Sequence, residues 1–236
     1  LGTEVINLKT LEAAEFAKLA DMVYRDVNIG LANELARYCD ALDLDFAAIR
    51  DAANTSGEAH LLLPGIGVGG HCTPVYPHFL INHAKEIDVP QKITESGREV
   101  NSNQPAHALN QIEKAVGSIT GKRILILGLG FRPGVKEHTK SPAFDIKNEI
   151  EKRGASVFLN DPYYKDQEIQ ELGFQSITDY HGIEIIILNT AHPQYAELNW
   201  GEISKAGCEL VYDGRNFWSK SNIVSADIKY LGVGRR

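Results

Sequence analysis

The first part of the chain carries an apolar pattern of helical period. Between Leu11 and Leu42, apolar residues recur at intervals of three and four and form one stripe: Ala20, Val23, Tyr24, Val27, Leu31, Leu35 and Tyr38. This spacing predicts one helix of roughly thirty residues, well above the usual length. Phe16, Leu19, Ile29 and Ala32 are apolar outside the stripe, so we expect a second covered face. The helix is therefore a candidate central spine, shared with a second subunit.

Further helices are expected before residue 117. One covers 43–53 with Asp43 as its cap, and a second covers 77–85. A third stretch, 93–116, is interrupted near Pro105, because proline ends or kinks a helix at the preceding residue. Residues 1–117 are thus predicted to be mainly helical.

The pattern changes at residues 118–121, the best candidate domain boundary. Short apolar runs then predict strands at 122–130, 155–160, 183–189, 209–213 and 228–231. Helices are expected at 142–153, with Ser141 as N-cap and Gly154 as stop, and at 194–205. This alternation predicts an α/β fold, in which a helical domain, 1–117, precedes a Rossmann-like, doubly wound parallel sheet, 118–236. Ligands of such sheets bind at the carboxyl ends of the strands.

Composition excludes several classes of function. The chain has 236 residues and a net charge of -7, which argues against non-specific nucleic-acid binding. It has no apolar run long enough to span a membrane, and its first residues are no signal peptide. Three widely spaced cysteines without a Cys-x-x-Cys indicate a reducing compartment, the cytoplasm, and no zinc site. His107, His138, His181 and His192 show no metal-ligand spacing and are expected to be surface or capping residues.

A glycine-rich segment, 64–74, is the most unusual stretch of the chain. It has four glycines in six positions and delivers Cys72 just before a predicted helix. A thiol near a helix N-terminus is favoured as the thiolate. One interpretation is a nucleophilic cysteine beside a glycine-walled pocket, and the other is a structural loop with a buried, inert cysteine. His71 is adjacent in sequence, and adjacent residues usually point apart, so a Cys–His dyad is disfavoured.

Two other features bear on ligand binding. Lys18 and Met22 lie four residues apart on one side of the long helix, where a lone lysine is ordinarily a surface residue. The segment 128–133 matches only the first half of a dinucleotide fingerprint, since Pro133 stands in place of the third glycine. It predicts a nucleotide-binding sheet whose ligand is not necessarily NAD.

Three groups of residues together resemble the UDP-glucose/GDP-mannose dehydrogenase family of nucleotide-sugar 6-dehydrogenases. They are 14–18 with 25–34, the segment 64–77, and 128–137 with 141–142, 160–162 and 213–216. The resemblance covers essentially the whole chain. Family members also carry an N-terminal Rossmann domain that binds NAD, which this sequence does not contain. The resemblance therefore implies a fragment that holds the central and UDP-sugar-binding domains and turns nothing over alone.

The resemblance also implies a chemistry. An NAD-dependent enzyme oxidises the C6 alcohol of a UDP-sugar to a carboxylate in two hydride transfers, through a cysteine thiohemiacetal and thioester. Cys72 would be the nucleophile, and Lys18 would stabilise the oxyanion. The substrate-binding residues that it implies are Gly67, Gly69, Gly70, Arg132 and Arg215. The NAD site is expected mainly on the N-terminal domain, and the long helix implies a homodimer.

Three positions depart from the family pattern. Met22 replaces a common asparagine, Tyr76 replaces a common aspartate, and Thr139 replaces an arginine that reaches the cofactor. With the runs 70–72 and 25–28, Tyr76 makes the chain similar to members that act on UDP-N-acetylglucosamine or UDP-N-acetylmannosamine. No residue is assigned to water activation.

Two other functions stay open at this point. The chain could be a non-catalytic module that binds a sugar nucleotide and dimerises. It could also be a cysteine hydrolase that uses Cys72 with a histidine base. The hydrolase needs a histidine that the fold brings to the thiol.

Overall fold

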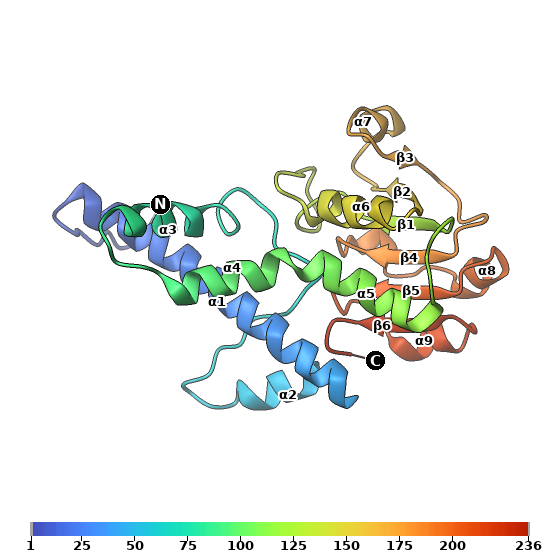
Figure 1. Cartoon of the computed structure of the whole chain (residues 1–236), viewed down its shortest axis with the longest axis horizontal. Helices are drawn as coiled ribbons and strands as arrows, with labels where there is room; N and C mark the ends of the chain where they lie inside the picture. Colours follow the sequence, from blue (N-terminus) through green and yellow to red (C-terminus); the bar gives the residue numbers. More distant parts are fainter. Residues whose placement is uncertain (1, 236) are drawn as a thin grey trace.

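The computed structural model describes residues 2–235, with helices first and a parallel sheet after them (Figure 1). The long helix α1 (Leu11–Leu42) has the predicted bounds. The hydroxyl of Thr10 caps its start by accepting a hydrogen bond from the N–H of Ala13 at 3.2 Å. The predicted α/β class is confirmed. Among the described residues, no helix combines the length and the apolar character that a bilayer-spanning segment requires.

The start of the second helix differs from the prediction. α2 (Phe46–Ala53) is capped by Asp45, whose carboxylate accepts a hydrogen bond from the N–H of Ala47 at 2.9 Å. Asp43 instead ends α1 in the left-handed conformation, with φ of 55°. The assignment of Asp43 as the cap of the second helix is therefore wrong.

The face of α1 that is buried is not the predicted apolar stripe. Tyr24, Leu31 and Tyr38 belong to that stripe but are 54%, 46% and 65% exposed. The buried residues of α1 are instead small or polar: Met22, Asp26, Gly30, Ala32, Asn33, Ala36, Cys39 and Asp40. An apolar stripe on the long helix is therefore open to solvent in the single chain.

Partners on α4 (Lys92–Ser102) explain why α1 buries polar residues. The guanidinium of Arg98 donates to the carboxylate of Asp26 at 2.6 Å, and both side chains are buried. The amide of Asn33 donates to the Oδ1 atom of Asn101 at 2.8 Å. Because these buried polar groups are paired, burying them costs far less than it would alone.

The other helices of this part follow the sequence closely. α3 (Tyr76–Glu86) comes after the glycine-rich segment, and α4 is followed directly by α5 (Gln104–Val116). Pro105 lies in the first turn of α5, where its missing N–H costs nothing. The predicted interruption is confirmed.

Six strands form one parallel sheet within the described residues. In chain order they are β1 (Arg123–Leu127), β2 (Ser156–Asn160), β3 (Gln175–Ser176), β4 (Ile185–Leu188), β5 (Leu210–Asp213) and β6 (Lys229–Gly232). Their spatial order, β3-β2-β1-β4-β5-β6, is that of a Rossmann sheet. The edge strand β3 and the helix before it, α7 (Asp166–Glu171), were not predicted.

The helices that cover the sheet agree with the prediction in part. α6 (Pro142–Lys152) starts after Ser141, whose hydroxyl accepts from the N–H of Ala143 at 3.2 Å, and Gly154 follows it with φ of +74°. The helix expected at 194–205 is in fact two short elements, η1 (Pro193–Tyr195) and α8 (Trp200–Lys205). Asn199 separates them because its side chain caps α8. α9 (Lys220–Val224) precedes the last strand.

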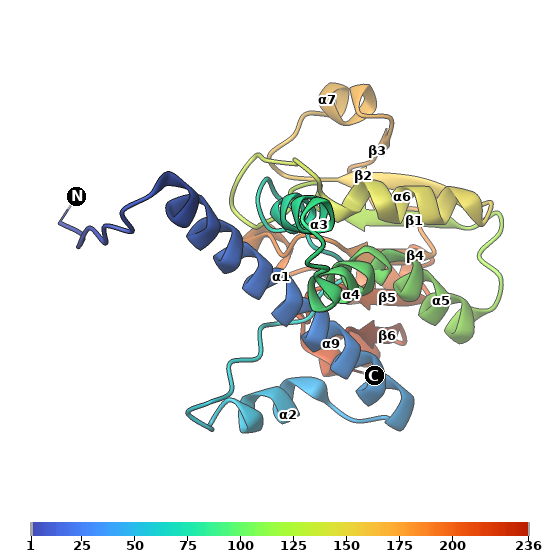
Figure 2. The same cartoon turned by 60° about the vertical axis from the view of Figure 1, so that its left-hand side comes forward.

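Alternate strand residues pack into two apolar layers. Ile124 and Ile126 join a core that continues into α5, α6 and the end of α1, whereas Leu125 and Leu127 pack with Trp200 on the other face. The chain end docks on the helical part, since the N–H of Phe46 donates to the carbonyl of Gly234 at 2.9 Å. Figure 2 shows α1 running from the free N-terminal end to this contact beside β6.

Candidate functional site

The glycine-rich segment connects the helices to the sheet. The N–H of Gly65 donates to the side chain of Asn33 on α1 at 2.9 Å. The next N–H, of Ile66, donates to the carbonyl of Gly214 after β5 at 3.0 Å. Further along, the N–H of Gly70 donates to the carbonyl of Thr139 at 2.9 Å. The segment is therefore fixed by backbone bonds to both parts of the chain.

Two of its glycines are required by their surroundings. A Cβ atom at Gly69 would lie 2.6 Å from the Cβ of Phe131, which is closer than side chains can approach. Gly70 has φ of +103°, a conformation that side chains disfavour. The loop can pass this close to the sheet only because these positions are glycine.

Cys72 is the accessible cysteine of the three. It is half-buried, while Cys39 and Cys208 are buried. Burial raises the pKa of Cys39, and it raises the pKa of Cys208 to about 12. The carbonyl of Cys72 accepts hydrogen bonds from the N–H groups of Val75 and Tyr76, at 3.1 and 2.9 Å, in the turn that begins α3. The thiol therefore lies one turn before the helix, as predicted.

All the predicted site residues line one cavity of about 490 Å³, which we call the Cys72 cavity. They are Lys18, Gly67, Gly69, Gly70, Cys72, Arg132 and Arg215. The helix α1, the glycine-rich segment and two turns at the carboxyl ends of strands each contribute to it. The structure thus brings together residues nearly 200 positions apart in the sequence.

One side of the Cys72 cavity is a stripe along α1. Lys18, Met22, Arg25 and Ile29 all line it, at helical spacings of four, three and four. Arg25 was not among the predicted site residues. Its position seven residues after Lys18 was the signal that could have found it.

The charges around this cavity have one sign. Lys18, Arg25, Arg132 and Arg215 line it, and none of its lining residues is an aspartate or glutamate. Lys18 is half exposed, with its Nζ atom 3.3 Å from Asp21 on the same helix. Four cations around one cavity, with a single salt-bridge partner among the residues that the structure describes, attract an anionic ligand.

Arg215 is the most firmly held of the four cations. Its Nε atom donates to the carbonyl of Asn189 at 2.6 Å, and its Nη1 atom donates to the carbonyl of Gly67 at 3.3 Å. Loss of water around the guanidinium lowers the pKa of Arg215 to about 10, with Asp213 opposing the shift. The group is still charged at neutral pH. Arg132, in contrast, is exposed, with its guanidinium 5.6 Å from the ring centre of Phe131.

His71 does not pair with the neighbouring thiol. Its Nε2 atom lies 3.4 Å from the carboxylate of Glu137. Hydrogen bonds from the hydroxyl and the N–H of Thr139, and then from His71, lower the pKa of Glu137 to about 2. This arrangement directs the imidazole to the carboxylate and gives no support to a Cys–His dyad.

The glycine turn after β1 is filled by a side chain of the protein. The carboxylate of Asp161 accepts hydrogen bonds from the N–H groups of Leu129 and Gly130, at 2.7 and 3.2 Å. In dinucleotide-binding sheets these N–H groups face the cofactor's pyrophosphate. An NAD pyrophosphate therefore does not fit this turn, which agrees with the incomplete fingerprint.

His192 holds the carboxylate of Asp161 in place. It is fully buried, with its Nε2 atom 3.1 Å from the Asp161 carboxylate, and its Nδ1 atom accepts from the N–H of Gly134 at 3.2 Å. His192 is therefore not a surface residue, although it stands at the N-cap position of η1. No group of three or more histidine, cysteine or acidic side chains within residues 2–235 is placed to hold a metal ion.

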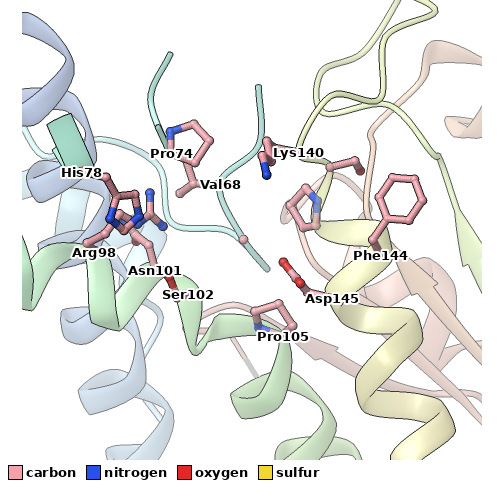
Figure 3. A pocket seen from close by; sticks show the side chains of 13 residues that line it. Val68, Pro74, His78, Arg98, Asn101, Ser102, Pro105, Lys140, Phe144 and Asp145 are labelled. Atoms are coloured by element: carbon pink, nitrogen blue, oxygen red, sulfur yellow. The ribbon is translucent and has the colours of Figure 1, made fainter. Parts of the chain in front are cut away.

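A second cavity, also about 490 Å³, shares Gly67 and Val68 with the first, and we call it the Arg98 cavity. Figure 3 shows its lining, with His78 and Arg98 on the helical side and Lys140 and Asp145 on the side of α6. Burial raises the pKa of Asp145, with Lys140 opposing the shift. This cavity is thus lined by charges of both signs.

Family models match both parts of the chain. The central-domain model of the UDP-glucose/GDP-mannose dehydrogenase family matches residues 12–103. The UDP-binding-domain model of the same family matches residues 125–220. The two matches follow the helical part and the sheet in order.

Curated and solved relatives agree with these matches. The UDP-N-acetyl-D-mannosamine dehydrogenase of Pyrococcus horikoshii is 31% identical over 98% of this chain and 54% of its own length. Its solved structure superposes with a TM-score of 0.78 at 29% identity, over 94% of this chain and 52% of that one.

Two further relatives are similar to the chain over comparable lengths. The UDP-N-acetyl-D-glucosamine 6-dehydrogenase of Pseudomonas aeruginosa is 30% identical over 94% of this chain and 51% of its own. The solved NDP-N-acetyl-D-galactosaminuronic acid dehydrogenase of Methanosarcina mazei has a TM-score of 0.83 at 26% identity, over 95% and 51% of the two chains. The chain spans about half the length of these relatives. With both family models matched in order on the same fold, the chain belongs to the UDP-glucose/GDP-mannose dehydrogenase family.

Proposed function

We propose that the chain is the central and UDP-sugar-binding part of an NAD-dependent nucleotide-sugar 6-dehydrogenase. The single observation that carries the proposal is the lining of the Cys72 cavity: four cations, no carboxylate and the accessible thiol. A UDP-sugar has a diphosphate for the cations and a primary alcohol at C6 for the thiol end. The substrate that we propose is UDP-N-acetylglucosamine or UDP-N-acetylmannosamine, the sugars in the names of two relatives.

Each residue has a role that its position supports. Arg132 and Arg215, at the carboxyl end of the sheet, bind the diphosphate, and Arg25 adds charge from α1. Gly67, Gly69 and Gly70 let the backbone approach the sugar. The Cys72 thiolate bonds to C6 of the aldehyde, the carbonyl electron pair moves to the oxygen, and Lys18 stabilises that oxyanion.

The cofactor is a separate matter. NAD does not fit the glycine turn after β1, where the carboxylate of Asp161 accepts from the N–H groups of Leu129 and Gly130. We propose that the division into domains, 1–117 and 118–236, separates the thiol end of the site from its diphosphate end.

Calorimetry on this chain tests the proposal. We expect binding of UDP-N-acetylglucosamine or UDP-N-acetylmannosamine, weaker binding of UDP-glucose, and no binding of NAD. Binding of NAD alone would overturn the assignment of the sheet, and a preference for UDP-glucose would overturn only the choice of sugar.

The exposed stripe of α1 supports a homodimer. Leu31 borders a groove of about 380 Å³ between α1 and α4, with Val27, Ile93 and Val100 on its walls. Contiguous exposed apolar side chains along a helix are typical of an interaction surface. We propose that a second copy of the chain covers it, through the same face of its own long helix.

Light scattering tests the dimer. Leu31→Glu should shift the mass of the wild-type dimer to that of a monomer. Phe79→Glu is the matched control, because Phe79 is 57% exposed on α3, outside the groove. A monomeric wild type at micromolar concentration, or an equal effect of both variants, would contradict this interface.

A further inference from the structure

The chemistry proposed for the Cys72 cavity includes a step that needs a base. A thioester at Cys72 becomes a carboxylate when water adds to its carbonyl carbon, and a base that takes the water proton speeds this addition. Lysine and arginine side chains hold their own protons at pH 7 and cannot serve. Among the described residues that line this cavity, His71 alone has a side chain suited to accept a proton from water at neutral pH.

The imidazole of His71 is oriented by Glu137. Its Nε2 atom lies 3.4 Å from the Oε2 atom of that carboxylate, and its ring meets the ring of Phe131 edge to face, with 6.5 Å between centroids. The contact with Glu137 is long for a hydrogen bond, and contacts between catalytic groups shorten when the reacting molecule is in place. A carboxylate beside Nε2 favours the tautomer with the proton on that nitrogen. The Nδ1 atom then carries a lone pair, and it has no hydrogen-bond partner among residues 2–235.

Glu137 is itself held in place by Thr139. The hydroxyl and the N–H of Thr139 donate to the Oε1 atom of Glu137 at 2.6 and 3.0 Å, which leaves Oε2 for His71. These bonds help to lower the pKa of Glu137 to about 2, so the carboxylate is charged at neutral pH. The carbonyl of Thr139 accepts from the N–H of Gly70, the residue before His71, at 2.9 Å. Thr139 therefore holds both members of the His71–Glu137 pair.

We propose that His71 is the general base that activates water for hydrolysis of a thioester at Cys72, with Glu137 as its positioning residue. This inference rests on the proposed function, in which Cys72 carries the acyl group. The water oxygen bonds to the thioester carbon while a water proton passes to Nδ1 of His71. The carbon–sulfur bond then breaks, and its electron pair leaves with the sulfur as the Cys72 thiolate. The side chain of His71 is 61% exposed, so water can reach it.

Release of an acetyl group from Cys72 tests the base on the whole chain without a cofactor. p-Nitrophenyl acetate acylates the thiol, and mass spectrometry of the Cys72 peptide follows the loss of the acetyl group. We expect His71→Ala to slow this loss about 100-fold, the lower end of what general base catalysis contributes. Acetylation should stay within about twofold of the wild-type rate, because the imidazole is paired with Glu137 and not with the thiol. Glu137→Gln removes the charge and should slow the loss about tenfold.

Two further measurements separate a base from a residue that only holds the loop. Added imidazole should restore most of the release rate in His71→Ala, because it supplies the missing base. His83→Ala, the matched control, removes an exposed histidine of α3 that lines neither the Cys72 cavity nor the Arg98 cavity, and should change neither rate. If His71→Ala loses its helical circular dichroism, His71→Gln takes its place.

The outcomes are distinct for the inference and for the proposed function. A release rate in His71→Ala within about threefold of wild type, or slow release that imidazole does not restore, overturns the role of His71 as a base. Equal slowing of acetylation and release also overturns it. Each of these results leaves the proposed function standing. Failure of the wild type to bind any UDP-sugar overturns the proposed function, while the effect of His71 on acetyl release is still measured.

Discussion

Two cavities of equal volume lie against the same glycine-rich segment, yet they differ in the balance of their charges. The Cys72 cavity is lined by four basic side chains and no carboxylate. The Arg98 cavity has basic side chains too, but Asp145 lines it, and Arg98 is already paired with the buried Asp26. Volume and arginine content alone would therefore not distinguish the two, whereas uncompensated charge does.

The difference follows from what each arginine must do in the fold. Arg98 is buried between α1 and α4, and its ion pair with Asp26 is needed because an unpaired buried charge is very unfavourable. Arg132 lies on a surface turn and has no carboxylate within salt-bridge distance among the described residues. Arg98 therefore serves the fold, and the free charge of Arg132 supports our proposal that it binds a ligand.

The largest expected effect is on stability, at Arg98. Arg98→Met should lower the free energy of unfolding by about 3–5 kcal/mol, because it leaves Asp26 buried without its cation. Urea denaturation followed by circular dichroism measures the loss. Asp26→Asn combined with Arg98→Met should recover a large part of it, since no charge is then buried. Arg132→Met, the matched control, should change stability by no more than about 0.5 kcal/mol.

The second effect is on ligand affinity, at Arg132. Arg132→Glu should weaken UDP-N-acetylglucosamine binding by roughly 100-fold, about 2.7 kcal/mol, because a charge-assisted hydrogen bond to the diphosphate becomes a repulsion. Calorimetry with UDP alone should show the same loss. Lys140→Glu, the matched reversal in the Arg98 cavity, should change affinity less than twofold. Equal losses from both variants would refute the comparison.

The third effect concerns the turn that presents Arg132. Burial raises the pKa of Asp161, but hydrogen bonds from His192, Tyr163 and Leu129 outweigh it and leave the pKa below its ordinary value. A carboxyl group with a lowered pKa stabilises the fold above its unfolded pKa, about 3.9, and that stability is lost as the pH falls through the folded value.

Asp161→Asn removes this stabilisation. At pH 7 we expect it to lower the free energy of unfolding by roughly 1–3 kcal/mol, because the N–H groups of Leu129 and Gly130 lose their charged acceptor. The difference in the free energy of unfolding between the variant and the wild type should become smaller as the pH falls below about 4. Denaturation curves at several pH values measure it, and a gap that is constant with pH would speak against this account.

The sequence was enough to predict the features that depend on local pattern. The bounds of α1, the Ser141 cap and the strands β1, β2, β4, β5 and β6 follow from apolar periodicity and capping residues. The two-residue strand β3 has no apolar run and could not be found in this way. The buried partner pairs on α1 and α4 were missed because they join residues 68–75 positions apart.

The candidate site could also be predicted only in part. Cys72, Lys18 and the arginines were placed by motif, and the structure brings them to one cavity. The burial of His192 was misjudged, because it depends on which surfaces a neighbouring element covers. Arg25 could have been found from its helical spacing to Lys18, whereas the Arg98 cavity depends on the packing of several elements, which no single stretch of sequence reveals.

The smallest expected effect is at Asp145, and it tests the comparison of the two cavities by changing the charge of the Arg98 cavity. Asp145→Asn removes the one carboxylate among the residues that line the Arg98 cavity, and leaves His78, Arg98 and Lys140 around it. If charge balance decides what a cavity binds, the variant should bind pyrophosphate about fivefold more tightly than wild type. The gain is small because Lys140 and Asp145 are both exposed to solvent.

Calorimetry with pyrophosphate measures this gain in affinity. Saturating UDP occupies the Cys72 cavity during the titration, so that the measured heat comes from pyrophosphate binding in the Arg98 cavity. Asp166→Asn, a neutralisation of equal size on the distant helix α7, is the control for net charge. Its pyrophosphate affinity should match wild type. If Asp145→Asn also matches wild type, then charge balance is not what separates the two cavities, and the shape of the Cys72 cavity must account for its choice of ligand.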